Sequence, residues 1–329
     1  MRRTTLIVVL ALALFLLAAS LPTAAGPLTQ DACPGSSSVE AWQTLGNDVL
    51  ENLLFDQGSL WVSDGTASAV LRLDADGAVL GGLSGIPSPG GLAAGGDGLI
   101  YAGWGNSLAN SITRSGQAKV VRFNPTDPDG TVSVFAEGFN MPNGMTFLPD
   151  GALAISNDFD RGLLRIEQDG SWSEIASVWG TNGLVVSPDG EQLYAAVTFD
   201  QRSPIARVSL ADPSDVSYDI QLSFGAASLE PTVHADGDPG APLLGVKGLD
   251  DMTRDDAGNL YVVANGTGEL LRVDPSTGEA CLVAGGLQNP SSVRIAPEQG
   301  AFADGDPGTV DLYITEFSGI IRRVVARAA

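Results

Sequence analysis

The sequence predicts an all-β protein, and three observations support this prediction. Beyond an apolar segment at the start, no long stretch repeats its apolar residues at the 3.6-residue period of a helix. Short apolar or β-branched runs instead alternate with turn residues, and the chain contains 41 Gly and 19 Pro. The runs also recur in groups of four, at a long period that is typical of a β-propeller.

The first two runs of each group are the most alike. Each copy has a polar pair, an apolar run, a turn with Asp or Gly, and a second apolar run. The copies begin at Leu50, Ser88, Pro142, Thr181, Leu249 and Asn289. The last copy is degenerate, because its second run, DLYITE, follows an acidic insertion.

Third and fourth runs complete most copies. Third runs include AVLRL, KVVRF, GLLRI and ELLRV, and fourth runs include SVFAEGF, SEIASVW and ACLVAGGL. Four strands in each of about six units, at roughly 40–65 residues per unit, predict a six-bladed β-propeller over residues 47–329 as a single domain. A β-sandwich or a parallel β-helix fits paired runs at this long period less well.

The start of the chain is expected to be a secretory signal peptide, residues 1–25. Two arginines precede an apolar run from Leu6 to Leu21, and small residues then offer a cleavage position after Ala25. The run is short for a membrane span, so an uncleaved anchor is the weaker alternative. We therefore expect a secreted or extracytoplasmic protein in which residues 26–46 form a leader to the propeller.

Export makes the two cysteines informative. In an oxidising compartment, two thiols far apart in the sequence most often pair, which predicts a disulfide between Cys33 and Cys281. Two free buried thiols are the alternative. The bond would tie the leader to the fourth run of the fifth copy and so fasten the two ends of the ring.

The charge of the chain restricts its partners. The formal net charge is −22, from 39 acidic and 17 basic residues. A surface this acidic argues against nucleic acid and anionic membranes as partners, and it favours cations. The lone histidine, His234, lies in an acidic insertion and offers no zinc site. We expect a monomer that has no membrane contact once its signal peptide is removed.

A metal site is predicted where the blades converge. The first strand of every propeller blade lines the central channel, so the residues just before the first runs meet near one axis. They are Glu51, Gly90, Asn143, Asn182, Asp250 and Ser291. Two carboxylates brought together repel each other, and a hard cation removes this repulsion. Oxygen ligands suit calcium better than zinc, although another divalent cation fits them too.

The predicted metal ligands are therefore Glu51, Asn143, Asn182 and Asp250. Each of these residue types is also common in turns, so their shared position before the first runs is what distinguishes ligand from turn. The ends of the second runs should lie on the same face and could form a polar substrate rim or a merely solvated one. The rim candidates are Trp104, Asn106, Asn157, Asp200 and Asn265, and the same run ends also carry Asp64, Asp158 and Glu316.

Several of these segments resemble one known family. PNGMTFLPDG, TNGLVVSPDG and GLDDMTRDDAGNLYVV are similar to segments of the gluconolactonase/senescence-marker-protein propellers, and more distantly of the paraoxonases. The resemblance covers most of the mature chain. It implies that Glu51, Asn182 and Asp250 hold a divalent cation over the channel, with Asn143 as an additional ligand, and that the cation binds a lactone.

The resemblance also implies a mechanism, metal-assisted hydrolysis with Asp250 as general base. Asp251 is a rival for that role, since it stands where the Asn-Gly copies have glycine. Asn52 replaces the aspartate that a paraoxonase-type structural calcium needs, so no second buried calcium of that kind is expected. The third-blade Arg and Asn that orient substrate in the family have no clear counterpart here.

Two classes of function remain open. The first is an exported, calcium-dependent lactonase or related ester hydrolase that acts on a small molecule. The alternative is a non-catalytic propeller whose ring metal is structural and whose rim binds a carbohydrate, a peptide or a wall component, since propellers serve both purposes. A synthase of the strictosidine type has a similar propeller, but no residue here distinguishes it.

Overall fold

A computed structural model describes residues 30–35, 37–127, 130–200, 202–222, 247–302, 306 and 308–327. The predicted signal peptide, His234 and parts of the two acidic insertions, near residues 211–245 and 298–310, lie outside the described residues. Among the residues that are described, no helix has the length and apolar character needed to cross a membrane.

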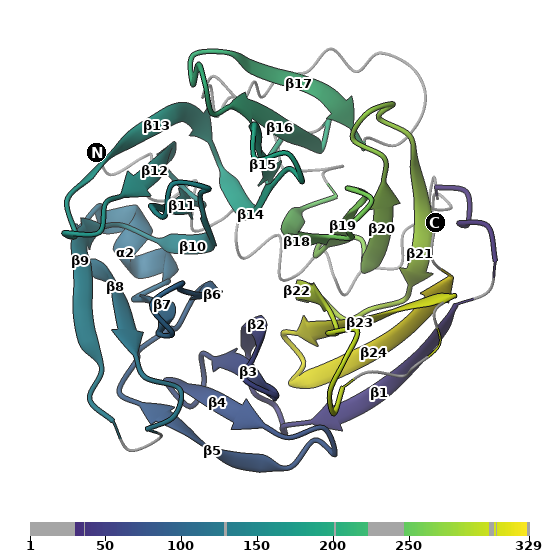
Figure 1. The fold of residues 1–329 in the computed structure, drawn as a ribbon, viewed down its shortest axis with the longest axis horizontal. Helices are drawn as coiled ribbons and strands as arrows, with labels where there is room; N and C mark the ends of the chain where they lie inside the picture. The colour runs from purple at the N-terminus through teal and green to yellow at the C-terminus, as the bar shows by residue number, and fades with distance from the viewer. Residues whose placement is uncertain are drawn as a thin grey trace.

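Six four-stranded antiparallel sheets are arranged around a central axis, as Figure 1 shows. The structure therefore confirms the predicted six-bladed propeller. Blade one consists of β2 (Leu50–Asp56), β3 (Ser59–Asp64), β4 (Ala69–Leu73) and β5 (Val79–Ser84). Blade two consists of β6 (Leu92–Ala94), β7 (Ile100–Trp104), β8 (Ala118–Phe123) and β9 (Ser133–Phe139). Blade three consists of β10 (Pro142–Phe147), β11 (Leu153–Asn157), β12 (Arg161–Ile166) and β13 (Trp172–Trp179).

The remaining blades follow in chain order. Blade four consists of β14 (Thr181–Val186), β15 (Gln192–Val197), β16 (Pro204–Ser209) and β17 (Val216–Gln221). Blade five consists of β18 (Leu249–Arg254), β19 (Leu260–Ala264), β20 (Glu269–Val273) and β21 (Ala280–Gly285). Blade six consists of β22 (Pro290–Ile295), β23 (Thr309–Glu316), β24 (Ile320–Arg327) and β1 (Ser38–Thr44). A short helix that the sequence did not predict, α2 (Leu108–Thr113), follows β7.

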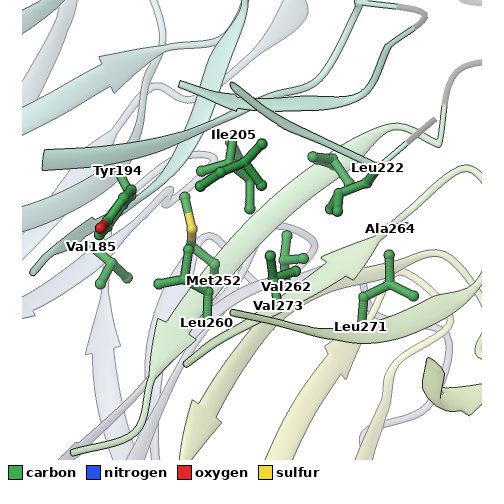
Figure 2. Packing of buried hydrophobic residues seen from close by; sticks show 13 residues of the cluster. Val185, Tyr194, Ile205, Leu222, Met252, Leu260, Val262, Ala264, Leu271 and Val273 are labelled. Atoms are coloured by element: carbon green, nitrogen blue, oxygen red, sulfur yellow. The ribbon is translucent and has the colours of Figure 1, made fainter. Parts of the chain in front are cut away.

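The hydrophobic core lies between neighbouring blades rather than at the axis. The described residues form six buried clusters, each shared by two adjacent blades. In the cluster of Figure 2, Tyr194 and Ile205 of blade four face Met252 and Leu260 of blade five. Alternating strand residues supply these faces because successive side chains point to opposite sides of a sheet. The channel is consequently left to polar groups.

The ring closes through the N-terminal strand. Strand β1 pairs antiparallel with β24 and completes blade six, so residues from both ends of the chain share one sheet. The propeller therefore begins at Ser38, and the expected boundary at residue 47 was too late. The run SVEAWQT lies on an edge strand, and its mostly exposed residues show little of the apolar alternation that marks a strand in the sequence.

The predicted disulfide is confirmed. Cys33 is bonded to Cys281, with 4.8 Å between the Cα atoms and 248 residues between the two positions. Beside the bond, the Cys33 amide donates to the Leu282 carbonyl at 2.9 Å, which extends the edge of β21. The bond is of the kind that persists in oxidising compartments.

Removing this bond should destabilise the ring strongly. In the chain-entropy model, a closed loop of this length contributes about 5 kcal/mol of stability. We expect Cys281→Ser to lower the free energy of unfolding by a large part of that amount, measured by denaturant titration. Cys33→Ser and the double variant are the controls, and they should lose the same amount because all three remove one bond. Unchanged stability in Cys281→Ser would contradict the expectation.

Candidate functional site

Bulges in the inner strands direct the candidate ligands toward the axis. Pairing with the second strand shifts by one residue between Leu50 and Asn52 in β2 and between Leu249 and Met252 in β18. Strands β10, β14 and β22 shift at the corresponding positions. A bulge leaves one residue out of the ladder and re-aims its side chain. The bulged segments contain Glu51, Asn143, Asn182, Asp250 and Ser291.

The four predicted ligands lie near one another as two hydrogen-bonded pairs. The Asn143 side chain hydrogen-bonds to the Glu51 carboxylate, and the Asn182 side chain does the same for the Asp250 carboxylate. The charges of Glu51 and Asp250 also repel each other. We call these four residues the inner ring. Their role as metal ligands stays a prediction.

An outer set of polar residues supports the inner ring. It occupies the turns that follow the second strands. Asn106 Nδ2 donates to Glu51 Oε1 at 3.0 Å, and Asn265 Nδ2 donates to Asp250 Oδ2 at 3.3 Å. Two of the predicted rim residues therefore orient ring carboxylates.

Asp158 belongs to the same outer set, and the sequence places it on this face at the end of a second run, although it was not predicted to act on the ring. It is only 7% exposed, its Oδ1 accepts from Thr198 Oγ1 at 3.1 Å, and its carboxylate also bonds to Asn143. Its charge acts on both Glu51 and Asp250. A sequence signal existed, because Asp158 directly follows the second run of its copy, as Thr198 and Asn265 do in theirs.

Burial and mutual repulsion raise the pKa values of these carboxyl groups. Loss of solvent and the charge of Asp158 raise the pKa of Glu51 to about 8, against the hydrogen bonds from Asn106 and Asn143 that lower it. Burial raises the pKa of Asp158 to about 7. Burial, then the charge of Glu51, raises the pKa of Asp250 well above its usual range. Without a cation, the ring therefore holds protons at neutral pH.

The residues present fit a hard divalent cation. Asn106 Oδ1 is buried and has no hydrogen-bond partner, which leaves an amide oxygen available beside the carboxylates. In the described part of the chain, no three His, Cys, Asp or Glu side chains are grouped to hold a metal, so a site here has to include carboxamides. Two carboxylates with carboxamide oxygens make a ligand set of the type that calcium prefers.

Asp251 lies in a different environment from Asp250. It is 2% exposed, and its Oδ2 lies 2.6 Å from Arg294 Nη1. Asn52 Nδ2 and Ser292 Oγ donate to the same oxygen, and the Met252 amide donates to Oδ1 at 2.8 Å. These donors occupy the lone pairs that a general base would need. The catalytic role of Asp251 stays untested, and the geometry favours a positioning role.

Asp251 has a side chain where blades two to four have glycine, because the inner strands of those three blades leave no room for one. A Cβ on Gly183 would lie 2.5 Å from the Cα of Asp251, and a Cβ on Gly91 would lie 2.0 Å from the Asn143 carbonyl oxygen. Inner strands therefore pack backbone to backbone in blades two to four. In blades five, six and one, the same level holds Asp251, Ser292 and Asn52.

The other rim candidates do not join the ring contacts described above. Asn157 is 5% exposed, and its Oδ1 accepts from the Met141 amide at 3.4 Å. Asp200 is 1% exposed and paired with Arg202 at 2.5 Å. Trp104 packs against the core between blades one and two, with Lys119 Nζ 5.6 Å from its ring centroid.

The fold and the site together define a class, a six-bladed propeller with a ring of carboxylates and carboxamides at one end of its channel. No family model and no curated protein matches the chain in sequence. Solved structures match it in fold. A putative gluconolactonase has a TM-score of 0.64 at 16% identity, with 91% of this chain and 96% of that chain covered.

Two further structures show the range of proteins with this fold. A gluconolactonase from Xanthomonas campestris has a TM-score of 0.59 at 18% identity, covering 93% of this chain and 99% of that chain. Virginiamycin B lyase from Staphylococcus aureus has a TM-score of 0.56 at 13% identity, covering 88% and 99%. The chain is therefore a propeller that matches gluconolactonases in structure at low sequence identity, and identities this low establish the fold alone.

Proposed function

We propose that this protein is an exported, calcium-dependent hydrolase that opens lactones. The observation that carries the proposal is the inner ring, in which a buried and a half-buried carboxylate converge with two carboxamides, without a basic partner of their own among the contacts described. Burying like charges together raises the free energy of the metal-free protein. A bound cation removes this repulsion, so the repulsion favours cation binding. The disulfide supports export, since such bonds are rare in reducing compartments.

Each residue has a definite role in this proposal. Glu51, Asn143, Asn182 and Asp250 would hold the ion, and Asn106 and Asn265 would orient the two carboxylates. A bound calcium ion would polarise the lactone carbonyl and make a water molecule more acidic.

The chain itself supplies the proton acceptor. Asp250 is the predicted general base, and Asp158 is a second buried carboxylate beside the ring, with a pKa raised to about 7. A base whose pKa lies near neutral pH is well matched to proton transfer there. Asp251, with its oxygens already bonded, would hold the strand in place.

The direct test is hydrolysis of a panel of lactones and aryl esters by the purified protein. We expect turnover of at least one lactone with calcium and none after chelation, followed by pH-stat titration of the released acid. Recovery on adding calcium back, but not magnesium, would identify the ion. A protein that binds calcium and hydrolyses no member of the panel would contradict the proposed activity.

The second candidate is a non-catalytic propeller with a structural ring metal. One observation favours it, a groove with a volume of about 460 Å³ at the opposite end of blades three and four. Its lining includes Pro149, Asp150, Arg165, Glu191, Gln192 and Leu210. A ligand bound there would be remote from the ring. Calcium binding without turnover in the lactone panel would favour this candidate.

A further inference from the structure

A second set of oxygen atoms lies one residue further along the inner strands than the ring. Asp251 Oδ2 accepts hydrogen bonds from Asn52 in blade one and from Ser292 and Arg294 in blade six. Asp251 itself belongs to blade five. This single carboxylate oxygen therefore ties together the three blades around the closure of the ring.

Arg294 is surrounded by oxygen atoms. Its Nη1 lies 2.6 Å from Asp251 Oδ2, 2.7 Å from the Val293 carbonyl and 3.3 Å from the Met252 carbonyl. Its Nη2 lies 3.5 Å from Asn52 Oδ1. A carboxylate, a carboxamide and two main-chain carbonyls are the ligand types of a calcium site, and here the two terminal nitrogens of one guanidinium lie against all four.

The arginine is an exception among the copies. Arg294 lies three positions after Ser291, the residue of blade six that is equivalent to the ring ligands. The residues three positions after the equivalent residue in other blades are Leu54 in blade one, Thr146 in blade three, Val185 in blade four and Thr253 in blade five. A charge at this position is costly to bury and is matched here by Asp251, which is itself an exception to the glycines of blades two to four. The two exceptions are partners, which indicates that they act together.

We propose that the Arg294 guanidinium takes the place of a second metal ion among these four oxygen ligands, which we call the oxygen cage, so that the protein binds one metal ion, at the inner ring. Through its bond to Asp251, Arg294 also holds Asp250 in position. The proposal rests on the proposed metal ring, but it does not depend on lactone turnover. Asp251 and Arg294 are accordingly positioning residues. Arg294 supplies the positive charge that balances Asp251. The ring carboxylates Glu51 and Asp250 therefore remain available to bind the exchangeable metal ion.

A double-mutant cycle on calcium binding tests the proposal. Metal-free protein is titrated with calcium chloride in a calorimeter, and the number of bound ions is checked by equilibrium dialysis. Wild type should bind one ion. Asp251→Asn leaves an unpaired positive charge close to the ring, so calcium affinity should fall at least 10-fold. Arg294→Met leaves Asp251 unpaired in an open cage, so the number of bound ions should rise from one to two.

The double variant separates this proposal from its rivals. Asp251→Asn with Arg294→Met removes both charges, so affinity should return to within about 3-fold of wild type, with one ion bound, because the net charge near the ring is restored. If Asp251 were a metal ligand itself, the double variant would bind as weakly as Asp251→Asn. That result, or a single ion at unchanged affinity in Arg294→Met, would overturn the proposal.

A matched control is available on the neighbouring inner strand. Arg254 bonds to the Val186 and Asp255 carbonyls and to neither ring carboxylate in these contacts, so Arg254→Met should leave affinity and ion number unchanged. Thermal melts of each metal-free variant confirm folding, and the double variant answers the question even if Arg294→Met does not fold. A wild type that binds no calcium would contradict both this proposal and the proposed function, whereas calcium binding without turnover contradicts only the latter.

Discussion

Replacing Asp250 by asparagine is expected to abolish both the calcium response and the lactone turnover of this protein. The change keeps the shape of the side chain and its contact with Asn265, but it removes one of the two ring charges. Turnover of the best lactone should fall on the order of 10²–10⁴-fold, the range for loss of a general base. By mass action, calcium at a hundred times its Kd should stabilise the wild type by about 2.7 kcal/mol. In the variant this stabilisation, and the rise in melting temperature that reports it, should nearly disappear.

The metal-free state of this variant provides an opposite and more specific signal. Because repulsion and burial disfavour the charged Asp250, the asparagine variant should melt at a higher temperature than wild type in chelator. Asp150→Asn is the control, since that aspartate lies in an exposed hairpin turn at the other end of blade three and pairs with Arg165. It should leave the calcium shift intact. Equal calcium shifts in wild type and Asp250→Asn would contradict the ring.

The stability of the metal-free protein is expected to fall as pH rises from about 4.5 to about 8. Glu51 has a pKa raised from 4.5 to about 8, so across this window the folded state keeps a proton that the unfolded state has lost. The unfolded state then binds fewer protons, and the free energy of unfolding decreases with pH. Asp158, with its pKa near 7, acts in the same direction. Each pKa unit corresponds to at most about 1.4 kcal/mol.

Calcium should remove this decrease of stability with rising pH. The ion binds the deprotonated carboxylates, so its affinity rises with pH through the same window and the melting temperature should no longer fall. Melting curves between pH 5 and pH 8.5, with calcium and with chelator, measure both effects. In chelator, Glu51→Gln and Asp158→Asn should each flatten the profile. A melting temperature that rises with pH in the metal-free wild type would show that the ring is not protonated.

The local pattern of apolar and turn residues was sufficient to predict the fold and much of the candidate site. The alternating runs and their turns predicted four strands per copy and six copies, because side-chain periodicity and turn chemistry are properties of neighbouring residues. Comparing equivalent positions in the copies then placed Glu51, Asn143, Asn182 and Asp250 at one level of the channel. The structure pairs Glu51 with Asn143 and Asp250 with Asn182, and it places the two carboxylates close enough to repel each other. The cysteine pair followed from the compartment that the N-terminal segment implies.

Only the tertiary structure decided which side chains share a charge or a hydrogen bond across blades. Asp251 and Arg294 are 43 positions apart and meet because blades five and six adjoin at the axis. Asp158 bonds to Asn143 of the ring and accepts a hydrogen bond from Thr198, which is 40 positions away in the next blade. Strand β1 joins blade six because its ladder partner, β24, lies at the other end of the chain. Periodicity fixes the direction of a side chain relative to its own strand, but burial, pairing and pKa depend on what the other blades place beside it.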